Sequence, residues 1–517
     1  MSLKNYIIRV FGLLNERAEY AVLRNYEGLP ERNESRDIDI IITRRGFRSI
    51  KRELVDTFCQ EGWRIVTYLN SDRLITFVCA KNVGNETEIV QWDFFLDTSV
   101  WGVELMSAEE FVEHRVWNGF LWHVDIVGEF LDKYLYNRAV GEAYPAKYEA
   151  IRRRIFGPLT EDLSHTDNIL HTDNILHTER TDNTEMTLRV PSGFDFSPTD
   201  DTDCSDSNSS FSSIRSLTSS KIARRIDTDF GALHVNSQLR VSSKLNEVFG
   251  CGDLVVCDGL SGKRLFGRAV WWNLKRRPFG LIAGVCAFLW SFVRNYICTN
   301  TGFAIGFTGP DGVGKTTVIE MLIERLGGVF RTAHSYMHFR PMLFGNLGEV
   351  AHSAGLKREV DRNYNDPHRG KKVGVLSSLV RLVYYSVDYI VGYWLKVKSQ
   401  IRITRLVVFD RYYTDVICDS RRSRIFLNYR FLYWFGRVFI PQLDYNILLT
   451  AEVDTILARK QELTREGIEA INERIDYLAG KKGYVKFLNE GGPEETVTEI
   501  LEWVFEEQHK RNLKRLF

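Results

Sequence analysis

The spacing of hydrophobic residues in the first 160 positions changes repeatedly between the period of a helix and that of a strand. A helical period predicts helices at 3–16 and 47–60, and from 108 to about 156. Alternating or short apolar runs predict strands at 20–24, 37–43, 63–69, 73–79 and 88–95. This order is typical of an α+β domain with a mixed or antiparallel sheet, which we assign to residues 1–160.

Residues 299–517 follow another pattern, in which short apolar runs alternate with helical segments. Strands are predicted at 303–308, 405–409 and 445–449, and helices at 317–326, 373–398, 453–462 and 493–510. Apolar strands separated by helices are typical of a parallel, doubly wound sheet. We therefore expect a C-terminal domain of the α/β class.

The segment between these domains is polar. Residues 161–222 contain the perfect tandem repeat HTDNIL at 165–170 and 171–176, and then a stretch rich in Ser, Thr and Asp. Such a composition buries too little apolar surface to offset chain entropy, so we predict a disordered linker. A duplication within a linker explains the repeats more simply than metal binding by their His and Asp side chains.

Residues 223–298 are predicted to form a connecting helical region. Its apolar run from 279 to 293 follows Trp271, Trp272 and the cluster Lys275–Arg277. The run is too short for a bilayer span, which needs about 20 residues. It is either an interfacial membrane helix, which would give a peripheral membrane contact through 271–293, or a helix that packs against the next domain. The pattern alone favours packing.

Composition adds limits to this picture. The 517 residues include 68 Lys and Arg against 67 Asp and Glu, a net charge of +1. This balance excludes a broadly basic nucleic-acid coat, and we expect no specific nucleic-acid binding. The linker, with 12 acidic and 4 basic residues from 161 to 221, carries −8, so the remainder carries +9. The eight cysteines form no Cys-x-x-Cys pair and no signal peptide is evident. Both observations favour the cytoplasm, either free or at the inner membrane face.

The sharpest motif is Gly-x-x-x-x-Gly-Lys-Thr between a predicted strand and a predicted helix. Its glycines allow backbone N–H groups to approach phosphate oxygens, and the helix that follows adds its N-terminal partial charge. The lysine can bridge phosphates, and the threonine can hold Mg²⁺. We predict that ATP and Mg²⁺ bind here, at Gly309, Gly312, Val313, Gly314, Lys315, Thr316 and Thr317.

Two further segments fit phosphate chemistry. Asp410 and Arg411 follow the buried strand at 405–409. There an acid can hold Mg²⁺ and an arginine can clamp an acceptor phosphate. The basic segment 458–465, with Arg459 and Arg465, can close over the nucleotide as a lid. The alternatives are a surface ion pair for the first segment and a solvated helix face for the second.

The loop GPDGVGKTT, the DRYY after a strand and the late arginines resemble thymidylate kinase-type nucleoside monophosphate kinases over about residues 300–510. The resemblance implies ATP-dependent phosphorylation of dTMP or a similar monophosphate in nucleotide biosynthesis. It also implies that Asp311 lies near the transferred phosphate, that Arg411 holds the acceptor phosphate, that Asp410 is linked to Mg²⁺, and that Arg459 and Arg465 belong to the lid. A homodimer is a further expectation.

Segments 338–341, 366–368 and 415–424 depart from the housekeeping pattern. They look like a divergent branch in longer bacterial proteins, some of them associated with surface-polysaccharide genes. Arg340 and His368 could therefore read a different acceptor, or could anchor a loop and cap a turn. The acceptor is then a nucleoside monophosphate or a sugar or lipid-linked phosphate.

The N-terminal domain resembles the nucleotidyltransferase fold. Asp37 and Asp39 are two residues apart on a strand, so their side chains point to one side, and Asp93 lies on another strand. Three such acids can form a two-metal site. The Gly-Ser that precedes these acids in the family is replaced by Leu23-Arg24-Asn25-Tyr26, so Arg24 and Asn25 bind phosphate instead or the site is inactive.

The preferred hypothesis is a phosphotransferase at 299–517, with nucleotidyl transfer as a second activity of the N-terminal domain. Another class of function is a nucleotide-gated switch or scaffold, in which ATP is bound and slowly hydrolysed and the degenerate N-terminal domain binds a partner. Turnover that depends on an acceptor distinguishes the two.

Overall fold

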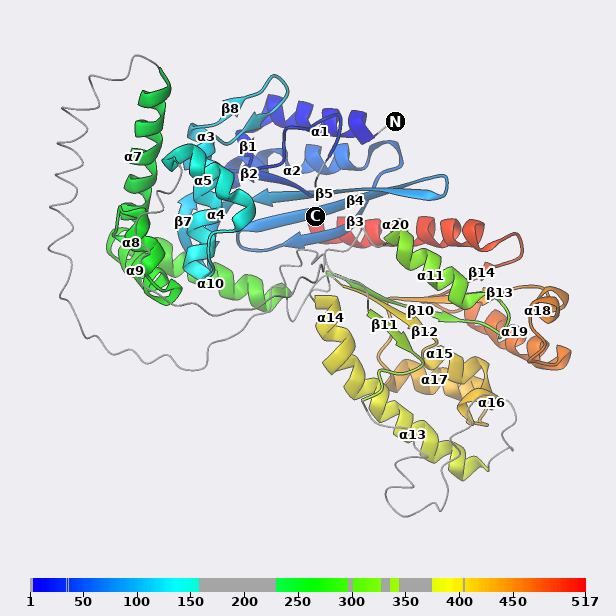
Figure 1. Ribbon diagram of the computed structural model, residues 1–517. Coiled ribbons are helices and arrows are strands. Elements are labelled where there is room, and N and C mark those ends of the chain that lie inside the picture. Colours follow the sequence, from blue (N-terminus) through cyan, green and yellow to red (C-terminus); the bar gives the residue numbers. More distant parts are fainter. Residues whose placement is uncertain are drawn as a thin grey trace, which may run out of the picture. The chain divides into compact units, whose positions relative to one another are not determined.

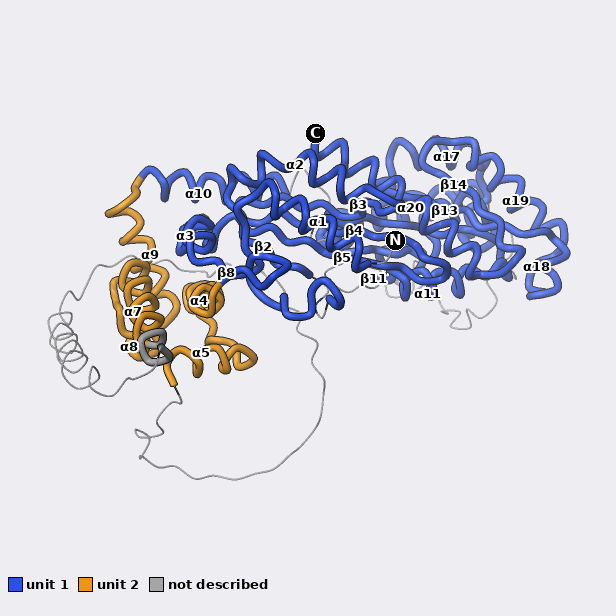
Figure 2. Tube along the Cα trace, turned by 90° about the horizontal axis from the view of Figure 1, so that it is seen from above, with its two compact units in different colours: residues 1–124, 279–517 blue, residues 125–278 orange. Residues whose placement is uncertain are grey.

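A computed structural model describes residues 3–33, 35, 37–157, 229–295, 301–326, 335–343, 374–402 and 405–517. The predicted linker at 161–222 with its HTDNIL repeats lies outside these residues, as does His368. The chain forms two compact units, shown in Figure 2: unit 1 comprises 1–124 and 279–517, and unit 2 comprises 125–278.

Unit 1 begins with a mixed sheet of strands in the order β3-β4-β5-β2-β1-β9-β8 (Figure 1). The pairs β2–β5 and β1–β9 are parallel, and the other neighbours are antiparallel. These strands are β1 (Tyr20–Val22), β2 (Asp37–Ile42), β3 (Arg64–Asn70), β4 (Leu74–Val83), β5 (Glu86–Phe95), β8 (Val116–Trp117) and β9 (Trp122–His123). The helices α1 (Leu3–Arg17) and α2 (Arg44–Phe58) contribute apolar side chains to the core of this sheet, and η1 (Gln60–Gly62) follows. The short pair β6 (Asp97–Val100) and β7 (Val103–Ser107) precedes α3 (Ala108–Glu113).

The second sheet of unit 1 is parallel throughout, in the order β11-β12-β10-β13-β14. Its strands are β10 (Phe303–Thr308), β11 (Ser335–His338), β12 (Leu406–Asp410), β13 (Tyr445–Thr450) and β14 (Tyr484–Leu488). Helix α10 (Pro278–Val293) precedes this sheet in the chain. The described helices that follow β10 are α11 (Lys315–Leu326), α13 (Val375–Gly392), the π-helical turn η6 (Tyr393–Val397), α14 (Lys398–Arg402), α15 (Tyr413–Cys418), α16 (Ser420–Ser423), α17 (Tyr429–Phe439), α18 (Val453–Arg459), α19 (Arg465–Ala479) and α20 (Pro493–Leu516). The prediction of α/β architecture with a parallel sheet and a mixed sheet is confirmed.

Unit 2 is helical within its described part: α4 (Ile126–Val140), η2 (Ala146–Tyr148), α5 (Glu149–Phe156), α7 (Asp229–Phe249), α8 (Leu254–Gly259) and α9 (Gly262–Arg276). Asp258 is a central acceptor, since Tyr134 and Arg152 each donate to its carboxylate at 2.8 Å. The helical stretch predicted from 108 to about 156 contains α3, α4 and α5, but β8 and β9 interrupt it between α3 and α4. The exposed tip between these strands, with Asn118 and Gly119, reverses the chain there.

The continuous helical segment Val375–Arg402 consists of α13, η6 and α14. By length and composition alone, it could cross a bilayer. The core helix of a protein outside membranes can share both properties. The shorter apolar helix α10 has 16 residues.

The outer edge of β3 is covered by α20. Since β3 is the last strand of the sheet, its outer edge has no strand partner, and α20 supplies side chains to this edge. The pairing of β3 with β4 has a register shift between Ile65 and Thr67. Asn512 Nδ2 donates to Ile65 O at 3.0 Å and to Val66 O at 2.9 Å, and His509 Nδ1 accepts from Ile65 N at 3.3 Å. Burial and the charge of Arg64 lower the pKa of His509, which keeps the ring neutral and able to accept.

We expect Asn512→Ala to lower the free energy of unfolding of unit 1 by about 2 kcal/mol, because two buried carbonyl oxygens lose their donor. Chemical denaturation followed by circular dichroism measures the change. Lys514→Ala, at an exposed position of the same helix, is the control. Its effect on stability should be below about 0.5 kcal/mol, as is usual for a surface substitution. Equal effects of the two substitutions would contradict the role given to Asn512.

Candidate functional site

Residues 309–314 of the motif form a loop between β10 and α11 at the carboxyl edge of the parallel sheet, and Lys315 and Thr316 begin α11. Gly312 and Gly314 have φ angles of 89° and 90°. A side chain would strain both positions. A Cβ atom on Gly309 would overlap with Leu449 O, so the loop also needs glycine for its close approach to β13. Thr316 and Thr317 lie exposed in the first turn of α11. The local geometry is that of a phosphate-binding loop.

Lys315 lies buried beneath this loop. Its Nζ donates to Gly309 O and Pro310 O, each at 2.8 Å, and lies 3.8 Å from Asp311 Oδ1. Burial and the nearby charge of Arg411 lower the pKa of Lys315 to about 7. A polyphosphate at the loop would favour the charged form, because it offers negative charge to an ammonium group held away from water.

Asp410 and Arg411 lie beside the loop, because β12 pairs in parallel with β10 and Phe307 is in register with Asp410. Arg411 has a φ of 73°. This conformation is uncommon outside glycine. The guanidinium of Arg411 forms ion pairs with Asp311 and with the buried Asp415. Burial opposes the charge of Arg411, but Asp415 and Asp311 raise its pKa above the ordinary value.

The carboxylate of Asp410 is arranged as a cation ligand would be. Its Oδ2 accepts from Tyr336 OH at 3.0 Å and lies 3.4 Å from His338 Nδ1, whereas Oδ1 is buried with no hydrogen-bond partner among the described residues. Burial works against its ionisation, but the bond from His338 and the charge of Arg411 lower the pKa of Asp410. An ionised oxygen without a donor, next to the phosphate loop, fits Mg²⁺.

Arg422 was not predicted as a site residue, yet its guanidinium forms an ion pair with Asp311. It lies on the short helix α16, which begins after Asp419, whose side chain accepts from the N–H groups of Arg421 and Arg422. The sequence signal was the departure at 415–424, but only the fold brings this arginine 111 positions back to the loop. Arg422 therefore adds a third cation to Lys315 and Arg411.

The two predicted lid arginines differ. Arg459 Nη1 donates to Asn489 O at 3.0 Å, and Asn489 Nδ2 donates to Val313 O at 2.7 Å, so Arg459 is linked to the loop through one residue. Arg465 instead pairs with Asp454, and both side chains are exposed. Their part in a lid stays a prediction.

Arg340 takes part in an internal ion pair. Its Nη1 lies 3.0 Å from Asp388 Oδ2, both side chains are buried, and the guanidinium lies 4.5 Å from the centre of the Tyr385 ring. Asp388 also accepts from Leu343 N. This geometry favours loop anchoring over recognition of an acceptor by Arg340.

The first sheet brings the other predicted acids together. Asp37, Asp39 and Asp93 each place a carboxylate oxygen within 4.8 Å of the others, because β2 and β5 pair in parallel with Asp39 opposite Asp93. Asp93 accepts from Thr76 Oγ1 and from Gln91 Nε2, which orients it. Arg24 Nη2 lies 2.7 Å from Asp39 Oδ2, so a guanidinium shares the carboxylate that a metal ion would use. The three acids fit a divalent cation, in competition with Arg24.

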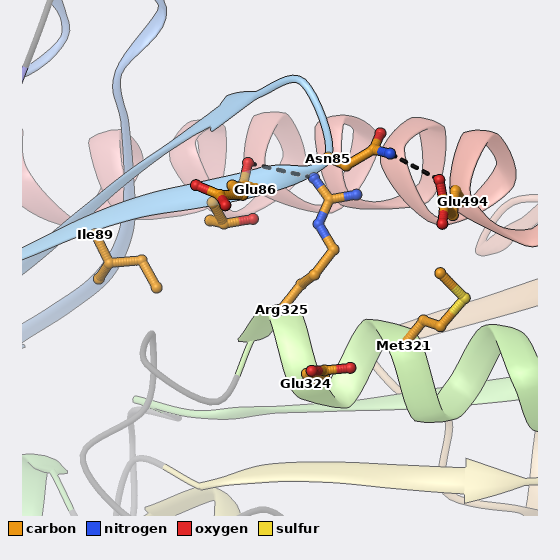
Figure 3. A pocket seen from close by; sticks show the side chains of 8 residues that line it. Asn85, Glu86, Ile89, Met321, Glu324, Arg325 and Glu494 are labelled. Atoms are coloured by element: carbon orange, nitrogen blue, oxygen red, sulfur yellow. Dashed lines mark hydrogen bonds between the residues drawn. The ribbon is translucent and has the colours of Figure 1, made fainter.

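A pocket of about 560 Å³ lies away from both clusters, within unit 1, between the β4–β5 hairpin and the helices α11 and α20 (Figure 3). Arg325 crosses it from α11 and donates to Thr498 Oγ1 at 2.7 Å and to Glu86 O at 3.5 Å. Asn85 Nδ2 donates to Glu494 across its rim. The pocket thus lies between the C-terminal part of α11 and β5, the strand that carries Asp93.

Comparisons with known proteins add one structural likeness. No protein-family description and no curated protein sequence matches the chain. Among solved structures, the thymidylate kinase of Ehrlichia chaffeensis is similar over 39% of this chain and 98% of its own, at 13% identity and a TM-score of 0.27. At that score the likeness decides nothing, and the functional proposal depends on the geometry of the two sites.

The low pKa of Lys315 predicts proton uptake when a nucleoside triphosphate binds. At pH 8 the free protein holds Lys315 mostly neutral, since its pKa is about 7. Binding should raise that pKa and take up close to one proton; at pH 6 the lysine is already charged and uptake should fall toward zero. Calorimetry with Mg²⁺-saturated nucleotide in buffers of different ionisation enthalpy measures the proton count. Uptake that is larger at pH 6 than at pH 8 would contradict this assignment.

Proposed function

We propose that residues 299–517 catalyse ATP- and Mg²⁺-dependent phosphoryl transfer to a phosphorylated acceptor. The observation that carries the proposal is the convergence of Lys315, Arg411 and Arg422 on Asp311 at one end of a parallel sheet, beside a glycine-rich loop. Three cations in a largely buried site are arranged for a ligand with several negative charges. A nucleoside monophosphate such as dTMP is the preferred acceptor, and a sugar or lipid-linked phosphate is the alternative.

Each side chain has a role in this mechanism. The loop N–H groups hold the donor phosphates, Lys315 exchanges its bonds to Gly309 O and Pro310 O for phosphate oxygens, and Arg411 clamps the acceptor phosphate. Arg422 stabilises charge that builds up between donor and acceptor. Mg²⁺, when bound by Thr316 and Asp410, would neutralise charge on the donor phosphates. An acceptor that is already a phosphate needs no general base. The described cysteines are free thiols, as suits the cytoplasm where ATP is supplied.

A panel of nucleoside monophosphates and sugar phosphates, read by ADP production, tests the proposal. We expect at least one acceptor to raise ADP release above the basal rate, and Lys315→Ala to lower that rate about 10³-fold with an unchanged circular dichroism spectrum. Lys486→Ala, at a lysine paired with Asp476 elsewhere in unit 1, is the control and should keep full activity. If no acceptor stimulates turnover but ATP still binds, the nucleotide-gated switch replaces the kinase.

A second function, nucleotidyl transfer, is favoured by the convergence of Asp37, Asp39 and Asp93 within 4.8 Å. Two metal ions held by these acids would activate an attacking hydroxyl and stabilise the charge on the leaving pyrophosphate. Arg24 opposes this, because its guanidinium already neutralises Asp39. The site can therefore be a transferase whose metal affinity Arg24 lowers, or a binding site in which Arg24 takes the place of a metal.

Metal binding distinguishes these options without any assay of activity. We expect Arg24→Ala to raise the affinity for Mn²⁺ about tenfold, measured by calorimetry without nucleotide, because Asp39 is then released from its ion pair. Arg17→Ala, at an exposed arginine near Glu53, is the matched control and should leave the affinity unchanged. The double substitution Asp37→Asn with Asp39→Asn should abolish binding; if it does not, Mn²⁺ occupies another site.

A further inference from the structure

Helix α10 presents an apolar stripe to solvent. Phe279, Ile282, Leu289 and Trp290 are 86%, 58%, 53% and 66% exposed, and Cys286 lies exposed between them. Their positions recur mainly at intervals of three and four residues, so they share one face of the helix. Several large apolar side chains exposed side by side on a protein surface mark a place of interaction.

The opposite face of α10 is fixed to unit 1. Gly284 meets Gly102 so closely that a Cβ atom on Gly284 would overlap with Gly102 O. Ser291 Oγ accepts from Asp72 N at 3.1 Å, and Asn295 Nδ2 donates to Asn70 O at 3.0 Å. These contacts hold one face of the helix against unit 1, and the described residues leave the stripe on its other face exposed.

The length of α10 limits what can cover it. The helix has 16 residues. A helix of that length spans about 24 Å, whereas the hydrocarbon core of a bilayer is about 30 Å thick. The docked C-terminal end also prevents the helix from passing through a membrane. A helix of this kind lies in the plane of the interface, with its apolar side among the acyl chains of one leaflet.

Charge along the chain identifies the kind of surface. No acidic residue occurs between Asp258 and Asp311, whereas this interval contains seven basic residues: Lys263, Arg264, Arg268, Lys275, Arg276, Arg277 and Arg294. Three of them immediately precede α10 in the chain and are exposed. Trp271 and Trp290 are also exposed. Their amphipathic rings are of the kind enriched at the level of lipid headgroups. Cations beside an apolar helix suit anionic lipids.

We propose that α10 anchors this protein to the surface of an anionic membrane, with the stripe of Phe279, Ile282, Leu289 and Trp290 inserted in one leaflet and the preceding basic residues on the headgroups. The proposal does not depend on the activity of either candidate site. It goes beyond the expectation of simple packing, because the described residues leave the stripe exposed.

Sedimentation of the full chain with vesicles tests the anchor. We expect binding to vesicles of phosphatidylcholine with 30% phosphatidylglycerol in low salt, about tenfold weaker binding to pure phosphatidylcholine, and marked loss of binding in 0.5 M NaCl. The double substitution Leu289→Glu with Trp290→Glu should lower binding to the anionic vesicles at least about tenfold. Both positions are exposed, so the melting temperature should stay unchanged.

The matched control is Leu376→Glu with Val380→Glu, which adds the same charges to the exposed apolar face of α13. This variant should bind vesicles as the unaltered chain does. Loss of binding in the α13 variant alone, or no binding of the unaltered chain to anionic vesicles, would overturn the proposal. A chain that binds no vesicles but is a dimer, and becomes monomeric with Leu289→Glu and Trp290→Glu, would show that a second copy covers α10 instead.

Discussion

The unpaired edge of β3 is the constraint on which the organisation of unit 1 depends. A strand at the edge of a sheet exposes backbone groups that attract other strands, and β3 is such a strand. Helix α20 satisfies them with His509 and Asn512. Its Leu516 belongs to the core of the first sheet, whereas Val66 and Val78 of that sheet belong to the core of the second. The two candidate sites therefore lie on one body with interlocked cores.

The glycine-rich loop shows how a fold can hold several basic side chains close together. Asp311 holds Arg411 and Arg422, and the carbonyl oxygens of the loop hold Lys315. Each charge is thus compensated in a poorly hydrated place, where an isolated one would be costly. In the proposed function, a phosphate ligand would exchange these partners for its own oxygens, so the basic side chains would need little reorganisation. In the first sheet the same compensation, by Arg24, works against a metal ion.

The sequence predicted those parts of the protein that depend on local pattern. The glycine spacing of the phosphate loop and the alternation around Asp37 and Asp39 are set by backbone geometry, so the loop and the acid cluster appear where they were expected. Strand β14 was not predicted, because it is short and half-exposed. Strands β8 and β9 were not predicted, because they have two residues each. Arg422 could not be placed, because its distance from Asp311 is set by the whole sheet. One face of α10 packs on unit 1, as its apolar composition favours, whereas the exposure of the other face could not be read from composition.

The contact between α20 and β3 can form only late in synthesis of the chain. Asn512 and Ile65 are 447 positions apart. At a rate of roughly 5 to roughly 20 residues per second, a ribosome needs roughly 20–90 s to reach the helix after making the strand. During this interval the outer edge of β3 and the apolar side chains that α20 covers are exposed to solvent. Vectorial synthesis thus leaves this edge of the first sheet without its α20 cover for tens of seconds.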